Sequence, residues 1–226
     1  MKTHSLTLLG KAISRTSKLL GKGHGSTWPG HIALTFQRTF IKNLLNNAPT
    51  KIILVVGTNG KTTTTKILST ILQASNYNVF ENTSGANLLN GIASSLLLHT
   101  NTQGKLTADY AIFEVDENNL PLVLKELTPT AIIALDLFRD QLDRYGELDS
   151  IAKSWAKAFT HLPSSTHLIL NADDPLIAYL GNEASASVDY FGLTDGTKLS
   201  LSHAADTTYC PQCNHKLTFN KITLML

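Results

Sequence analysis

The sequence Lys51-Ile-Ile-Leu-Val-Val-Gly57-Thr-Asn-Gly-Lys-Thr62 joins an apolar, β-branched run to a turn that contains two glycines. The run at residues 51–56 predicts a buried β-strand. Residues 62–74 predict an amphipathic helix, because their apolar side chains recur at helical spacing: Ile67, Leu68, Ile71 and Leu72. A strand, a glycine-rich turn and a helix in this order are the context in which a phosphate-binding loop occurs.

The turn between this strand and this helix has the composition that a phosphate-binding loop needs. Gly57 and Gly60 can adopt positive φ and let backbone N–H groups approach anionic oxygens at a helix start. Lys61 is expected to neutralise the β- and γ-phosphates of ATP, and the Thr62 hydroxyl is expected to hold Mg²⁺. The loop is shorter than the common eight-residue form, since Val occupies position 55, and an ordinary glycine-rich turn beside a surface lysine is the alternative. The expected cofactor-binding residues of this segment are Gly57, Thr58, Asn59, Gly60, Lys61, Thr62 and Thr63.

Outside this segment, strand patterns and helix patterns alternate along the chain. A helix is expected at about residues 32–45, before the first strand. After the loop helix, four further strand-and-helix pairs are expected, at residues 77–80 with 87–99, 110–113 with 120–127, 130–135 with 150–160, and 166–170 with 175–180. This alternation predicts an α/β fold, with a mostly parallel P-loop sheet and helices on both faces.

The residues that follow the predicted strands are mostly polar. In parallel sheets of this kind, ligands bind beyond the carboxyl ends of the strands. Glu114 follows the strand predicted at 110–113, and a carboxylate there is expected to bind Mg²⁺ directly or through water. A solvated acid at a strand end is the alternative for Glu114. The residues at such positions are Gly57, 81–84, Glu114, Asp136 and Asn171.

The length and composition of the chain predict a globular protein with one core and a small appendage. Its 226 residues are 42% hydrophobic and 16% charged, and its longest apolar runs are strand-sized. Neither a transmembrane segment nor a secretory signal is expected, which predicts a cytoplasmic protein.

Basic residues are concentrated at the start of the chain. Residues 1–80 hold ten of the 19 Lys and Arg and no Asp or Glu, whereas residues 81–226 hold all 17 acids. Four basic residues recur at the spacing of one helix face, namely Lys11, Arg15, Lys18 and Lys22. Such a helix could rest on anionic lipid, which would place the protein peripherally at the inner membrane face; a solvated basic helix and a mitochondrial transit peptide are the alternatives. Nucleic acid is not an expected partner, because no aromatic platform accompanies these residues.

Five segments occur in the order found in the Mur ligase family. They are Gly57-Thr-Asn-Gly-Lys-Thr-Thr-Thr-Thr65, Ser84-Gly-Ala-Asn-Leu88, Phe113-Glu-Val-Asp-Glu117, Leu137-Phe-Arg-Asp-Gln-Leu-Asp-Arg-Tyr-Gly-Glu147 and Asn171-Ala-Asp-Asp-Pro175. The chain resembles this family, and within it the MurT-type synthetase subunits. The resemblance implies a short basic, amphipathic segment at residues 1–50, a central ATP-binding domain at 51–200 and a partial zinc-ribbon-like insertion at 201–226.

The resemblance also implies roles for individual residues. Thr62 and Glu114 match magnesium positions of the family, and Gln141 stands where related Mur ligases place a magnesium-binding histidine. Asn87 and Asn171 match asparagines that face the adenine, although an asparagine at a helix start is often only a cap.

The activity implied by the resemblance is an ATP-dependent carbon–nitrogen ligation in peptidoglycan biosynthesis. The α-carboxylate of D-glutamate in the lipid II stem peptide would attack the γ-phosphate of ATP, and ammonia would then displace phosphate to give D-isoglutamine. A GatD-type glutamine amidotransferase would be the partner that supplies the ammonia. Lys61 and Glu114, with Mg²⁺, are the residues expected to act in catalysis. A related Mur or folylpolyglutamate-type amide ligase is the alternative.

The two cysteines of the chain, Cys210 and Cys213, are spaced too closely to staple a domain. They resemble one knuckle of the zinc ribbon inserted in MurT-type subunits, so a structural Zn²⁺ is expected, with a redox pair as the alternative. The family supplies a second cysteine pair and a further domain downstream, whereas this sequence ends at Leu226. The expectation is therefore a truncated MurT-type enzyme that binds ATP without turnover on its own, or a non-catalytic nucleotide-binding module.

Overall fold

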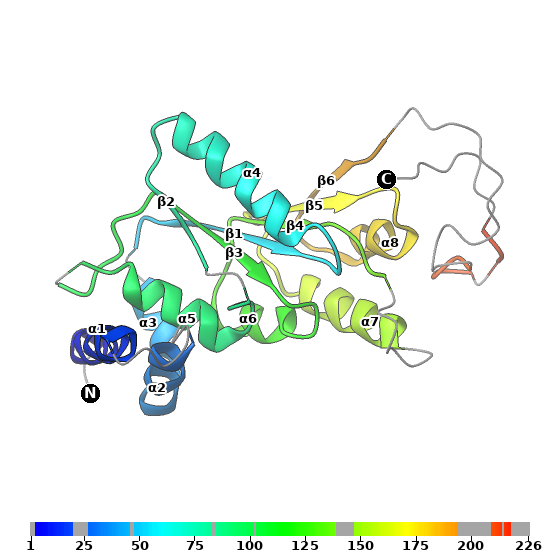
Figure 1. The fold of residues 1–226 in the computed structure, drawn as a ribbon. Helices are drawn as coiled ribbons and strands as arrows, with labels where there is room; N and C mark the ends of the chain where they lie inside the picture. Colours follow the sequence, from blue (N-terminus) through cyan, green and yellow to red (C-terminus); the bar gives the residue numbers. More distant parts are fainter. Residues whose placement is uncertain are drawn as a thin grey trace.

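The fold is built around a single parallel sheet (Figure 1). A computed structural model describes residues 3–19, 27–45, 48–82, 85–101, 103–138, 147–193, 209–213 and 215–217. Six strands lie in the order β2-β3-β1-β4-β5-β6, and each neighbouring pair is parallel. The strands are β1 (Lys51–Val56), β2 (Val79–Glu81), β3 (Tyr110–Val115), β4 (Ala131–Ala134), β5 (His167–Asn171) and β6 (Ser187–Phe191). The predicted parallel α/β sheet is confirmed, with β6 as an edge strand that the sequence reading missed.

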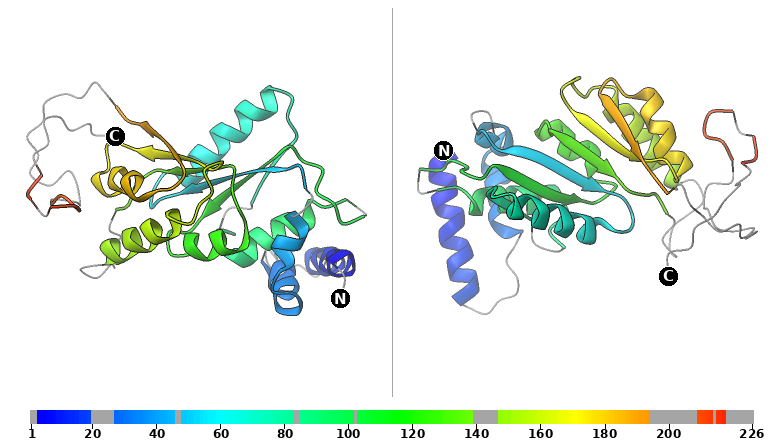
Figure 2. Two further views of the ribbon diagram at one scale, coloured as in Figure 1. Left: turned by 180° about the vertical axis from the view of Figure 1, so that it is seen from behind. Right: turned by 90° about the horizontal axis from the view of Figure 1, so that it is seen from above.

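Helices cover both faces of the sheet, as predicted (Figures 1 and 2). One face carries α4, and the other carries α5 to α8. These helices are α4 (Lys61–Ala74), α5 (Leu89–Leu98), α6 (Leu120–Glu126), α7 (Glu147–Phe159) and α8 (Pro175–Glu183). The main core lies between the sheet and α5 to α8, and a smaller apolar cluster lies under α4.

The register of the strands decides which side chains face α4. Val55 of β1 lies opposite Glu114 of β3 and opposite Ile133 of β4. Val55 and Ile133 are buried in the small cluster with Leu68 and Leu72, which belong to α4. Neighbouring residues across a sheet point to the same face, so Glu114 also points toward α4. Because β3 ends at Val115, Glu114 lies inside the strand, whereas the sequence predicted a strand that ends at residue 113.

An additional helical layer lies outside α5. It consists of α1 (Thr3–Leu19), α2 (Trp28–Phe36) and α3 (Phe40–Leu45). Helix α2 lies very close to α5. A Cβ added to Gly30 of α2 would overlap the carbonyl oxygen of Asn90 in α5, and the Gly30 N–H donates to Ser94 Oγ over 2.7 Å. Figure 2 shows this layer at the end of the molecule where the N-terminus lies.

The single helix predicted at residues 32–45 is wrong, because the structure has two helices there. Gln37 ends α2 with an extended backbone, at φ −145° and ψ 94°. Pro29 lies in the first turn of α2, where its missing N–H costs no hydrogen bond, so the helix starts earlier than the apolar pattern suggested. Among the described residues, none of the helices combines the length and the apolar character needed to cross a bilayer.

Candidate functional site

The turn after β1 leaves the start of α4 open. Gly57 has φ +141° and Gly60 has φ +78°, which are left-handed values that favour glycine. Gly60 is the N-cap of α4 and no side chain caps this end. The first N–H groups of a helix lack acceptors within the helix, so the amides of Lys61, Thr62 and Thr63 face outward at its positive end. The predicted strand–loop–helix geometry is present, with an end suited to anionic oxygens.

Asp136, just beyond β4, holds the loop in this shape. The Thr58 N–H donates to the Asp136 carbonyl oxygen over 3.0 Å, and the Asn59 N–H donates to Asp136 Oδ1 over 2.8 Å. The amides of Thr58 and Asn59 are thus already paired within the protein. Among the residues expected to bind the cofactor, the amides from Gly60 onward are the better placed ones for a phosphate.

Burial raises the pKa of the Asp136 carboxyl above its ordinary value of 3.8, although the Asn59 N–H and the Lys61 ammonium oppose the shift. The folded protein therefore holds this proton more tightly than the unfolded chain does. The resulting stabilisation is fully present below about pH 4 and is lost as the pH rises through the pKa of the folded state.

Asp136→Asn is expected to gain stability relative to the wild type as the pH rises. An asparagine Oδ1 can still accept from Asn59, while the buried charge is removed. Urea unfolding at about pH 4 and about pH 7.5 measures the difference in free energy between the two proteins. A difference that is equal at both pH values would contradict burial as the cause of the raised pKa.

A second set of bonds ties the loop to the segment after β4. Thr58 Oγ1 accepts from the Phe138 N–H over 3.0 Å and donates to the Phe138 carbonyl oxygen over 3.2 Å. Asp174 fixes that segment, because its Oδ2 accepts from the Leu137 N–H over 2.8 Å while its Oδ1 caps α8. Burial raises the pKa of the Asp174 carboxyl as well. The loop is therefore positioned from β4 and α8, and not by its own sequence alone.

Thr62 and Glu114 meet beside the open helix end. The Thr62 hydroxyl donates to Glu114 Oε2 over 2.9 Å, and the Glu114 residue is only 8% exposed. Buried Asn82 continues the strand pairing beyond β2, because its side-chain amide exchanges two 2.9 Å hydrogen bonds with the backbone of Glu114. Two oxygen atoms of the kind that Mg²⁺ prefers are thus held together next to the phosphate loop.

Lys61 lies folded over the loop. Its ammonium donates to the carbonyl oxygens of Gly57 and Thr58, and it lies 3.7 Å from Glu117 Oε2. Glu117 is held in turn by Trp155, whose indole N–H donates to the Glu117 carbonyl oxygen over 2.8 Å. A phosphate that binds at this loop would have to draw the Lys61 ammonium away from these oxygens.

Among the described residues, one position has the oxygen atoms that would suit Mg²⁺. Thr62 and Glu114 are in contact, as described above, and they are the pair that would hold the ion. Gln141, the third expected magnesium ligand, lies outside the described residues. Within the described part of the chain, no cluster of three or more His, Cys, Asp or Glu side chains could hold a metal ion.

Asn87 and Asn171 lie on opposite flanks of the loop. The Asn87 carbonyl oxygen accepts from the Asp116 N–H, next to β3, whereas Asn171 ends β5. In the sheet order, β1 and β4 separate β3 from β5, which amounts to about 14 Å at ordinary strand spacing. The Asn171 side chain is already paired, with Leu135 O and the Asp173 N–H. The two expected adenine contacts are therefore not brought together, and both roles stay predictions.

Cys210 and Cys213 lie at the two ends of a turn. The Cys210 N–H donates to the His215 carbonyl oxygen, and Tyr209 pairs with Lys216 in a short antiparallel bridge. The N–H groups of Cys213 and Gln212 lower the pKa of the Cys210 thiol. Two thiols are half of a tetrahedral site, so the described residues do not by themselves fit a structural Zn²⁺. Zinc binding by Cys210 and Cys213 stays a prediction.

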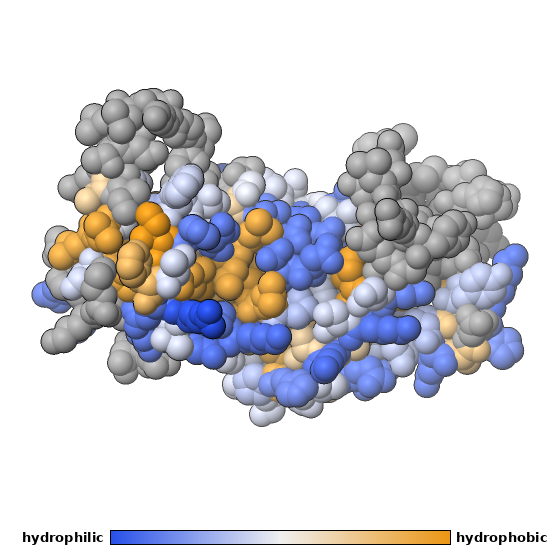
Figure 3. All heavy atoms as spheres, turned by 90° about the horizontal axis from the view of Figure 1, so that it is seen from below, coloured by the Kyte–Doolittle hydropathy of each residue, from blue (hydrophilic) through white to orange (hydrophobic). Residues whose placement is uncertain are grey.

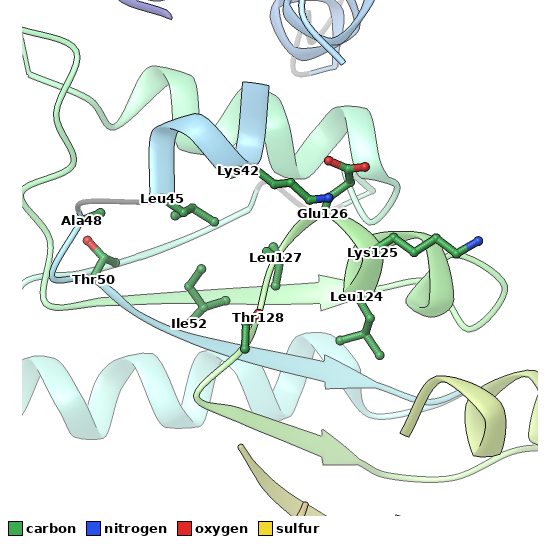
Figure 4. A pocket seen from close by; sticks show the side chains of 10 residues that line it. All are labelled: Lys42, Leu45, Ala48, Thr50, Ile52, Leu124, Lys125, Glu126, Leu127 and Thr128. Carbon is green, nitrogen blue, oxygen red and sulfur yellow. The ribbon is translucent and has the colours of Figure 1, made fainter. Parts of the chain in front are cut away.

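A separate cavity of about 430 Å³ lies near the amino ends of β1 and β4 (Figure 4). Lys42 and Glu126 point toward one another at its rim, and Lys125 points away from it. Glu126 Oε2 is buried without a hydrogen-bond partner. Because the phosphate loop follows the carboxyl end of β1, this cavity is not part of the loop site.

Sequence reasoning missed the residues that support the site from a distance. The sequence predicts only a strand-end position for Asp136 and for Asn82, and no separate role for Glu117 or Asp174. The available signal for Asp136 was a polar residue directly after a strand next to the loop strand. Nothing in the local sequence indicates the bonds from Asn82 to Glu114 or from Asp174 to Leu137, because these partners lie 32 and 37 residues away.

Comparison with known proteins matches residues 55–223 to the Mur ligase middle domain. The MurT subunit of lipid II isoglutaminyl synthase (glutamine-hydrolyzing) from Staphylococcus aureus (strain COL) is 33% identical over 215 residues, which cover 95% of this chain and 47% of that protein. The corresponding subunit of Streptococcus pneumoniae (strain ATCC BAA-255 / R6) is 33% identical over 221 residues, covering 96% and 48%. MurF ligase from Thermotoga maritima, solved in complex with ADP, has a TM-score of 0.60 at 19% identity, over 72% of this chain and 37% of that one, which shows a shared fold alone. The chain spans about half the length of the curated relatives it matches.

Proposed function

The chain belongs to the Mur ligase family, and we propose that it binds Mg²⁺ and ATP for a ligase that activates a carboxylate as an acyl phosphate. The observation that carries this proposal is the 2.9 Å hydrogen bond from Thr62 to the buried Glu114 beside the uncapped start of α4. That arrangement brings backbone N–H groups, a lysine and two metal-type oxygens to one point. A purely structural turn needs none of the last three.

Charge explains why such a site needs cations. A substrate carboxylate must approach a polyphosphate, and two unit charges about 4 Å apart repel by about 4 kcal/mol at an effective dielectric constant near 20. Lys61 supplies one positive charge, once it leaves the carbonyl oxygens of the loop. Mg²⁺ at Thr62 and Glu114 would supply the second and would polarise the γ-phosphate.

The proposed reaction has two steps. A carboxylate oxygen attacks the γ-phosphorus of ATP and the bond to the β-phosphate oxygen breaks, which gives an acyl phosphate and ADP. Ammonia then attacks the acyl carbon, phosphate leaves, and the nitrogen loses a proton to form the amide. The amides from Gly60 to Thr63 and the Lys61 ammonium would hold the phosphates during the first step.

For the substrate and the partner, we propose those of the MurT-type relatives. The names of these relatives describe a glutamine-hydrolysing synthase that forms isoglutaminyl lipid II, and a subunit of it. We propose the D-glutamate α-carboxylate of the lipid II stem peptide as the acceptor, and a GatD-type glutamine amidotransferase as the source of the ammonia. The 33% identity over 95% of the chain supports this assignment.

The product nucleotide tests the chemistry. The product of the complete reading frame that encodes this chain is incubated with a GatD-type subunit, glutamine, lipid II and Mg²⁺–ATP. We expect ADP and phosphate in equal amounts to the amidated lipid, and a hydroxamate when hydroxylamine replaces ammonia. Release of AMP and pyrophosphate would contradict the acyl phosphate, and amidation that persists in Lys61→Ala at the wild-type rate would contradict the site.

A further inference from the structure

Helix α1 leaves two of its leucines on the outside of the molecule. The residues that it buries include Leu6 of the main core, together with Thr7, Gly10 and Ser14, which are small or polar. Leu8 and Leu9, by contrast, are 51% and 41% exposed. A helix that is stabilised only by packing on its own domain keeps most of its leucines inward.

Helix α2 shows the same feature next to α1. Its nine residues include no Asp, Glu, Lys or Arg. Trp28 and Phe36 are 65% and 66% exposed, and with Ile32 between them they follow the i, i+4, i+8 spacing of one helix side. We refer to Leu8, Leu9, Trp28 and Phe36 together as the α1–α2 face. Figure 3 shows apolar side chains gathered at the end of the molecule where α1 and α2 lie.

The segment that carries this face has formal charges of one sign. No Asp or Glu occurs in residues 1–80, which hold ten Lys and Arg. Arg38, which follows α2, is exposed, and His31 is exposed within α2. An exposed tryptophan with leucines and phenylalanine, among basic residues without acids, is the pattern of a surface that lies in the headgroup region of an anionic bilayer.

We propose that the α1–α2 face docks on the surface of an anionic lipid membrane, with Trp28 and Phe36 inserted at the headgroup level. Close packing of Gly10 and Gly30 on α5 holds the two helices against the domain. An acidic protein partner would need basic side chains on α2 to pair with, and α2 has no Lys or Arg. The apolar side of α2 therefore favours lipid as the partner. This inference goes beyond the proposed ligase activity and does not depend on it.

Vesicle binding tests the proposal with the chain alone and without any lipid-linked substrate. Vesicles of phosphatidylcholine with phosphatidylglycerol are compared with vesicles of phosphatidylcholine only, by co-sedimentation. We expect the wild type to bind the anionic vesicles, and the variant Trp28→Ser/Phe36→Ser to bind them at least about tenfold more weakly. The matched control is Ile67→Ser/Ile71→Ser on α4, whose side chains are 54% and 57% exposed and which should bind as the wild type does.

Tryptophan fluorescence gives a second measurement on the folded protein. The chain has two tryptophans, and Trp155 is fully buried, so a blue shift on adding anionic vesicles reports Trp28. In Trp28→Phe the shift should disappear while sedimentation with vesicles continues. The proposal is overturned if the wild type does not bind anionic vesicles, or if the two double variants bind equally. It is also overturned if the Trp28→Ser/Phe36→Ser variant changes only the oligomeric state in sedimentation velocity, since the face would then contact protein.

Discussion

Gly57→Ala is expected to lower the free energy of unfolding by about 2–4 kcal/mol and to abolish detectable nucleotide binding. Two effects add. A φ of +141° is strained for any residue with a side chain, and a Cβ at this position would lie 3.0 Å from the Asp136 N and O atoms. Moving those backbone atoms would cost free energy, because the Asp136 carbonyl oxygen accepts the hydrogen bond from the Thr58 N–H that shapes the loop.

The matched control for this prediction is Gly85→Ala. Gly85 also has a left-handed φ, of +80°, but a Cβ there meets no atom within 4 Å. The control should therefore show the backbone strain alone, about 1–2 kcal/mol, with nucleotide binding retained. Urea unfolding followed by circular dichroism measures both variants. Equal destabilisation in the two variants would mean that the contact of Gly57 with Asp136 does not shape the loop.

Features that depend on neighbouring residues were predictable from the sequence. The strand at residues 51–56 and the helix that follows the loop are local patterns, and the structure has them as β1 and as α4, which begins at Lys61. The alternation of strands and helices was enough to predict a parallel sheet with helices on both faces.

Features that depend on pairing across the sheet were not predictable in the same way. Glu114 was predicted to follow a strand, but it lies within β3, and only the register opposite Val55 explains why it reaches Thr62. Asp136 accepts a hydrogen bond from the Asn59 N–H of the loop, 77 residues away, and no sequence spacing predicts this bond. The break between α2 and α3 at Gln37 likewise interrupts an apolar pattern that continues through it.

The exposed side of α1 was also only partly predictable from the sequence. Basic spacing in α1 was visible, but the exposure of Leu8 and Leu9 was not, because a leucine in an amphipathic pattern is normally assigned to the core. The small residues on the inner side of α1 become meaningful only once Gly10 is seen against Leu97 of α5.

Lys61→Ala is expected to weaken the binding of Mg²⁺–ATP by at least about 100-fold. A charge-assisted hydrogen bond contributes about 1.5–3 kcal/mol, and one lysine can reach oxygens of two phosphates. The value of 100-fold corresponds to two such bonds at the lower end of the range, about 1.5 kcal/mol each. The lower end applies because Lys61 must first leave the Gly57 and Thr58 carbonyl oxygens and Glu117. The matched control is Lys66→Ala on the same helix, since Lys66 is exposed and pairs with Glu81 away from the loop.

Calorimetric titration of Mg²⁺–ATP into the wild type, Lys61→Ala and Lys66→Ala measures the affinity that a triphosphate gains from the loop. Circular dichroism of the three proteins beforehand establishes that each is folded. The expected result is binding by the wild type, an affinity within about twofold for Lys66→Ala, and a loss of about 100-fold or more for Lys61→Ala. Unchanged affinity in the folded Lys61→Ala variant would contradict a phosphate-binding role for this loop.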